Sequence, residues 1–90
     1  MEIFHWINKQ GVESSNGFCV QRISRFESTY CAQDRSIIVS VEAGYKDGKH
    51  IIFYSKSSFL AWSSDITEQL QAIKNFRSAI TFMGSTPIET

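Results

Sequence analysis

The sequence has few of the residues that mark covalent frameworks, catalytic centres or membrane spans. Its 90 residues include two cysteines, two histidines and one proline. Cys19 and Cys31 are too few to staple a secreted mini-protein and lack the C-x-x-C spacing of a redox or zinc site. We therefore expect two reduced, half-buried thiols. No segment approaches the roughly 18 consecutive apolar residues that a membrane span needs, and residues 1–9 lack the basic start of a secretory signal. These absences favour a cytoplasmic protein.

A net charge is also lacking. Nine basic and nine acidic residues cancel, so no long-range field draws the chain to nucleic acid or to an anionic membrane. By contrast, apolar material is plentiful at 42% hydrophobic and 13% aromatic residues, which argues against disorder. The totals predict one folded domain over residues 1–90, with a loose tail at residues 85–90.

Catalytic motifs are absent as well. His5 and His50 are the residues whose side chains ordinarily titrate near neutral pH, and neither belongs to a recognisable nucleophile or metal motif. H-x-x-x-H, G-x-S-x-G and phosphate-binding glycine loops do not occur in the sequence. We expect a protein that is not an enzyme and that needs no cofactor or metal.

The clearest element is a helix over residues 65–83. Asp65 can accept hydrogen bonds from the first turn, and Glu68 three residues later completes a capping box. Gly84 and Pro87 indicate the end of the helix. Apolar residues recur at steps of three and four, which predicts one buried side: Ile66, Leu70, Ile73, Phe76, Ile80 and Met83.

Before this helix the apolar period changes to two. Residues 18–21, 26–31, 37–42 and 50–55 alternate in the manner of strands. The fold class predicted is α+β, with a four-stranded antiparallel β-meander, the long C-terminal helix packed on one face, and a short N-terminal helix over residues 2–10. An edge strand is the alternative for that N-terminal segment.

The pairing of these strands can be tested by register. Pairing Tyr30 with Ile37 and Val41 with Ile51 puts one set of apolar residues on a single inner face, namely Phe18, Val20, Phe26, Tyr30, Ile37, Val39, Val41, Ile51 and Phe53. The C-terminal helix is the natural cover for this face.

The outer face of the predicted sheet mixes apolar and polar residues. Ile38, Ile52 and Tyr54 amid polar neighbours suit a protein-binding patch with an apolar centre and a polar rim. The alternative is that the N-terminal segment folds back over this face through Phe4, Trp6 and Ile7. The candidate partner-binding residues are Glu27, Asp34, Ile38, Glu42, Asp47, His50, Ile52 and Tyr54.

A second functional hypothesis is a small regulatory module that binds nucleic acid. Arg22, Arg25 and Arg35 lie near aromatic residues in the sequence, as in strand-based binders of single strands. Those aromatic residues, however, occupy the strand positions that face the predicted core. Nearby acidic residues also cancel much of the positive charge.

A family resemblance adds to this interpretation. The stretch from Ile52 to Trp62, IFYSKSSFLAW, precedes a helix that ends AITFMG at residues 79–84, with FCVQR at 18–22 and DRS at 34–36. This pattern resembles small immunity proteins of bacterial polymorphic-toxin and contact-dependent growth inhibition systems. Ser63 and Ser64 stand where the family's proline-rich link is expected.

The resemblance implies a cytoplasmic antitoxin. Such a protein binds the toxic C-terminal domain of its cognate effector, often a nuclease, and covers the active site. It needs no catalytic residue, because specificity comes from a surface that matches one partner and penalises others. On this hypothesis Glu27, Asp34, Glu42 and Asp47 form a local acidic patch.

Overall fold

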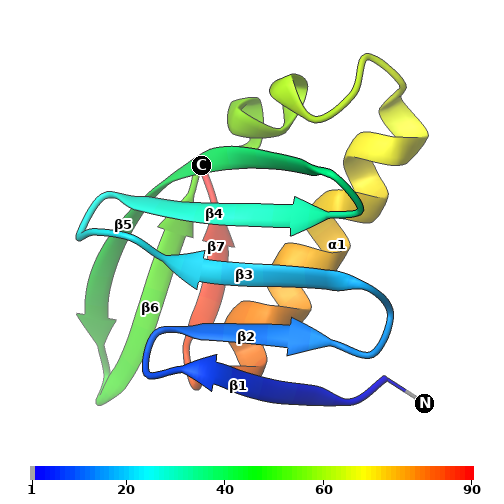
Figure 1. Ribbon diagram of the computed structural model, residues 1–90. Coiled ribbons are helices and arrows are strands. Elements are labelled where there is room, and N and C mark those ends of the chain that lie inside the picture. The colour runs from blue at the N-terminus through cyan, green and yellow to red at the C-terminus, as the bar shows by residue number, and fades with distance from the viewer. Residues whose placement is uncertain (1) are drawn as a thin grey trace.

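The computed structural model describes residues 2–90, in which one mixed sheet of seven strands packs with one long helix. The strands are β1 (Phe4–Asn8), β2 (Gly11–Ser14), β3 (Phe18–Arg22), β4 (Glu27–Ala32), β5 (Arg35–Lys46), β6 (Lys49–Tyr54) and β7 (Thr86–Glu89). Between β6 and β7 lie the 3-10 helix η1 (Lys56–Ala61) and the helix α1 (Ile66–Phe82). Strands β1 to β6 form an antiparallel meander, and β7 joins it parallel to β6. Figure 1 shows α1 crossing one face of this sheet.

The α+β prediction is confirmed, but the four-stranded meander is only the centre of the sheet. The N-terminal segment is not a helix, because β1 and β2 form a hairpin in which Trp6 lies opposite Val12. The tail is not loose, since residues 86–89 form β7 beside β6. Short apolar runs do not distinguish helix from strand, and β7 exists because α1 returns the chain to the open edge of β6.

The core lies between α1 and the inner face of the sheet. Val20, Tyr30 and Val39 are buried there. The ring of Phe59, from η1, lies 5.7 Å from the ring of Phe76 on α1. Burial of each large apolar side chain contributes about 1.5–3 kcal/mol, so these contacts hold the helix and the connector to the sheet.

Helix α1 begins at the predicted cap, Asp65, but the predicted capping box does not form, because the N–H of Asp65 donates to the hydroxyl of Ser63 at 3.0 Å rather than to Glu68. Asp65 accepts hydrogen bonds from the backbone N–H groups of Thr67 and Glu68, at 2.7 and 3.2 Å. The predicted apolar stripe is correct at Ile73, Phe76 and Ile80, which are buried.

The first two turns of α1 depart from the predicted stripe. Ile66 and Leu70 are 59% and 51% exposed, and Gln69 and Ala72 take the inward positions. The side chain of Gln69 donates to the carbonyl of Ser63 at 2.6 Å. This bond ties the helix to the connector before it and satisfies a polar group that is otherwise costly to bury.

The register of β5 and β6 also differs from the prediction. Asp47 and Gly48 form a two-residue turn with φ of 54° and 78°, so Val41 lies opposite Tyr54 rather than Ile51. Side chains alternate with period two, and an odd shift therefore exchanges the two faces of a strand. As a result Ile52 and Tyr54 join the core cluster, while Phe53 lies against Gly44 outside that cluster.

One hairpin pairing is confirmed, and one core assignment is wrong. Tyr30 lies opposite Ile37, as predicted. Phe26 is exposed, because it precedes β4 and its ring stacks under the guanidinium of Arg25, 5.4 Å from the centroid.

The two cysteines are not separate thiols. Cys19 on β3 and Cys31 on β4 are direct cross-strand partners and form a disulfide, with Cα atoms 5.3 Å apart. The expectation of two reduced thiols is wrong, because counting cysteines ignores the register that brings them together.

Candidate protein-binding surface

The face of the sheet opposite α1 is not covered by the N-terminal segment. Strands β1 and β2 extend the sheet at its edge instead of folding across it, so that His5, Glu13 and Cys19 continue the same outer row. His5 Nε2 lies 3.8 Å from Glu13 Oε1, and both side chains are exposed. The outer face therefore remains open between β1 and β5.

Two of the eight candidate residues are not on the surface. Ile52 is 3% exposed and Tyr54 is 1% exposed, so their assignment to a partner-binding face is wrong. The hydroxyl of Tyr54 accepts a hydrogen bond from Arg77 at 2.8 Å and donates to Glu89 at 3.3 Å. These bonds give Tyr54 a structural role between β6, α1 and β7.

The other six candidates are exposed but lie in three places. Glu27, Ile38 and Glu42 share the outer face of β4 and β5. Asp34 and Asp47 lie in the turns at the two ends of β5, and His50 packs against Tyr45 near the tip of the β5–β6 hairpin, with ring centroids 5.2 Å apart. The predicted acidic patch is therefore reduced to Glu27 and Glu42, and a binding role for these residues stays a prediction.

The three arginines of the nucleic-acid hypothesis are also separated. Arg22 ends β3 and Arg25 follows it in the loop, whereas Arg35 begins β5 at the other end of the β4–β5 hairpin. The guanidinium of Arg35 lies 4.1 Å from the Trp62 ring centroid and donates to the Trp62 carbonyl at 2.8 Å. Because Arg35 is held by Trp62, the three side chains do not form one patch.

The surface with the most concentrated aromatic character was not predicted. It combines Phe4 and Trp6 of β1 with Phe82 at the end of α1, and we call it the aromatic edge. The Phe82 ring stacks on Phe4 at 5.1 Å and lies 6.0 Å from the ring of Trp6. Trp6 is nevertheless 48% exposed and Phe82 is 43% exposed. One sequence signal pointed to this surface. Phe82 is an apolar residue of the helix that does not belong to the predicted buried stripe.

The backbone of β1 adds to this surface. β1 is an end strand of the sheet and pairs only with β2 among the described residues. Proteins protect such edges against further pairing with proline, charge or bulges. The edge strand β7 carries Pro87, and β1 has a register shift between Trp6 and Asn8. The regular part of the β1 edge is therefore short, and the exposed rings dominate its binding chemistry.

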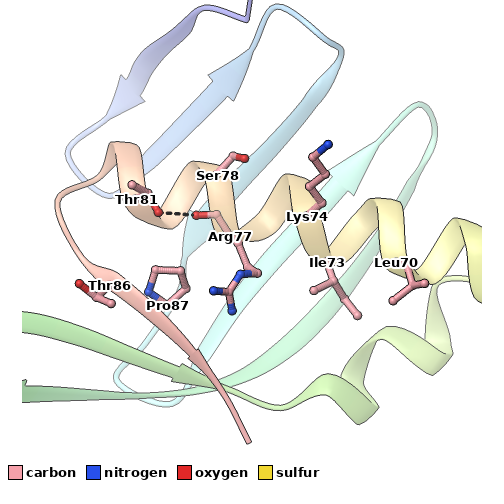
Figure 2. Close-up of a pocket in the computed structure, with 8 residues that line it drawn as sticks. All are labelled: Leu70, Ile73, Lys74, Arg77, Ser78, Thr81, Thr86 and Pro87. Atoms are coloured by element: carbon pink, nitrogen blue, oxygen red, sulfur yellow. Dashed lines mark hydrogen bonds between the residues drawn. The ribbon is translucent and has the colours of Figure 1, made fainter.

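A groove between α1 and β7 is the other concave surface of note. It has a volume of about 570 Å³ and is lined by Leu70, Ile73 and Pro87, with Lys74 and Arg77. Figure 2 shows the Arg77 side chain reaching from α1 toward β7, while Lys74 points to the opposite side of α1. Because Arg77 is held by the Tyr54 hydroxyl, the groove offers an apolar floor with Lys74 at its rim.

Other site classes were tested against the described residues. Within residues 2–90, no group of three or more histidine, cysteine or acidic side chains is placed to hold a metal ion. The same part of the chain contains no helix with the length and apolar character required to cross a membrane. Comparison with protein-family models, curated proteins and solved structures found no match.

Proposed function

We propose that this protein is an immunity protein that neutralises a cognate bacterial toxin domain by binding it and covering its active site. The single observation that carries the proposal is the aromatic edge, where Trp6 and Phe82 stay half-exposed beside an end strand. Tryptophan is enriched among the few residues that dominate binding energy at protein interfaces.

The composition of the surrounding surface agrees with this proposal. Ile3, which precedes β1, and Ile7 are exposed as well. Exposed apolar side chains rimmed by polar residues are typical of protein-interaction sites. Glu27 and Glu42 on the open outer face add acidic groups that can oppose a basic toxin, which favours fast and selective association.

Co-expression with the toxin domain encoded beside this chain tests the proposal. We expect the pair to purify as a stoichiometric complex, and we expect the chain to restore growth to cells that express the toxin domain. Trp6→Ser combined with Phe82→Ser should weaken the complex, since the aromatic anchors are then absent. Ile66→Ser is the matched control, because it removes an exposed apolar side chain at the opposite end of α1 from Phe82.

The nucleic-acid alternative predicts a different result. A module of that type would be retained on RNA or DNA, with an affinity that falls steeply as salt rises. Growth rescue without any complex, or salt-sensitive retention on nucleic acid by the unmodified chain, would contradict the immunity proposal.

A further inference from the structure

A small pocket opens where the β1–β2 turn and the end of β3 meet the C-terminal end of α1. Its volume is about 130 Å³. Ile52 and Trp6 supply apolar walls, Gln10 and Ser85 add neutral hydrogen-bonding groups, and Lys9 and Arg22 bring positive charge. The pocket lies apart from the α1–β7 groove and shares only Trp6 with the aromatic edge.

The charge of this pocket is not balanced within the structure. Its lining contains two cations and, among the described residues, no acid. Arg25, Arg35 and Arg77 each lie over an aromatic ring. Arg22 is half-buried, and its side chain has no hydrogen-bond, ion-pair or aromatic partner within residues 2–90. Its N–H groups are therefore available to an acceptor from outside the chain, and arginine N–H groups bind anionic oxygens strongly.

The backbone that carries the two cations is held in position by a network of hydrogen bonds. The backbone N–H of Arg22 donates to the carbonyl of Gln10 at 2.9 Å, and the N–H of Gln10 donates to the side chain of Asn8 at 2.8 Å. The amide of Asn8 donates to Gln21 at 2.7 Å, and Gln21 donates to the carbonyl of Arg22 at 3.0 Å. The turn that carries Lys9 is thereby fixed beside Arg22. Such preorganisation lowers the entropic cost of binding a ligand.

We propose that this pocket, which we call the Lys9–Arg22 pocket, binds a phosphate group. Two cations suit a dianion, and the planar guanidinium of arginine binds two oxygens of a phosphate group through paired N–H donors. A water molecule occupies about 30 Å³ in the liquid, so the pocket has room for a phosphate group. The phosphate is either inorganic or the end of a larger phosphate monoester.

Titration of the folded chain with inorganic phosphate and, separately, glycerol phosphate tests this proposal and distinguishes the two sources. Ionic strength is held constant with sodium chloride, and backbone amide shifts are followed by NMR. We expect saturable binding of one phosphate, with shifts concentrated at residues 8–11, 21–23 and 84–86. Tighter binding of glycerol phosphate would indicate a monoester as the ligand, and tighter binding of inorganic phosphate would indicate the free ion.

Three variants provide the controls. Arg22→Gln should raise the dissociation constant at least tenfold, and Lys9→Gln should raise it by a smaller factor. Arg25→Gln should leave it unchanged, because Arg25 belongs to the same loop but does not line the pocket. The shift map of the parent chain remains decisive even if a variant does not fold.

Non-saturable shifts, shifts spread over other surfaces, or equal weakening by Arg25→Gln would overturn the proposal. The measurement needs no partner protein, so its failure leaves the immunity proposal standing and its success does not establish that proposal.

Discussion

Two buried tyrosines make the free energy of unfolding of this protein decrease at alkaline pH. Burial raises the pKa of Tyr30 and of Tyr54 above the ordinary 10.0, although hydrogen bonds from Asn75 and Arg77 oppose the effect. A raised pKa means that the folded state holds the phenolic proton more strongly than the unfolded state does. The contribution to stability is therefore complete below pH 10 and is lost as the pH rises through 10 toward the pKa values of the folded state.

Urea unfolding at pH 8, 10 and 11 measures this effect. We expect the free energy of unfolding to decrease between pH 8 and pH 11, and we expect Tyr54→Phe to show a smaller decrease because one of the two phenols is gone. An equal decrease in the free energy of unfolding between pH 8 and pH 11 in the parent and in this variant would show that Tyr54 does not contribute to the pH dependence.

Residues of the core were predictable where their strand register was predictable. Val20, Tyr30 and Val39 were assigned to the inner face and are buried. Ile52 and Tyr54 were assigned to the surface, because the prediction paired Val41 with Ile51, whereas the two-residue turn at Asp47 and Gly48 pairs Val41 with Tyr54. The position of a turn determines on which face of the sheet each following residue lies. The alternation of apolar and polar residues does not by itself give that position.

At the scale of elements, the cap of α1 is the most direct test of the helix. Asp65→Ala removes the acceptor for two N–H groups of the first turn, and such a loss costs about 1 kcal/mol. Chemical denaturation should show this decrease. Ser64→Ala is the matched control at the neighbouring exposed position, and an equal decrease in that variant would contradict the capping role.

The β3–β4 hairpin carries the second element-scale prediction. The disulfide joins residues twelve positions apart, and closing a loop of that size stabilises the folded state by about 3 kcal/mol. Reduction should lower the free energy of unfolding by that order. The Cys19→Ser, Cys31→Ser double variant should give the same stability with and without reductant.

Thiol labelling checks the pairing itself. The native chain should take up no label until it is reduced, and then two equivalents. Labelling of the unreduced chain at both positions would contradict the disulfide and restore the sequence-based expectation of free thiols.

Elements with strong local signals were predicted, and those that depend on distant partners were not. Helix α1 has its own cap, stripe and stop signal. Strand β7 has only four residues, including a proline, and exists because β6 offers an edge to pair with. Strand β1 has an apolar pattern compatible with a helix, and its pairing with β2 decided the outcome.

At the scale of the whole molecule, the proposed binding surface is made by segments from both ends of the chain. Phe4 and Trp6 come from β1, and Phe82 comes from the last turn of α1. Figure 1 shows how the sheet brings β1 to the C-terminal part of α1. The sequence patterns predicted a surface on the outer face instead, because they placed Ile52 and Tyr54 there and favoured a short helix for the N-terminal segment.

The central claim is that the aromatic edge is where this protein binds its partner. Isothermal titration of a candidate toxin domain encoded next to this chain, with the parent chain and with the Trp6→Ser, Phe82→Ser double variant, tests it most directly. We expect the double variant to bind at least tenfold more weakly, which corresponds to about 1.4 kcal/mol, while Ile66→Ser binds like the parent. Equal affinities for the parent and the double variant, with both chains folded, would contradict the claim.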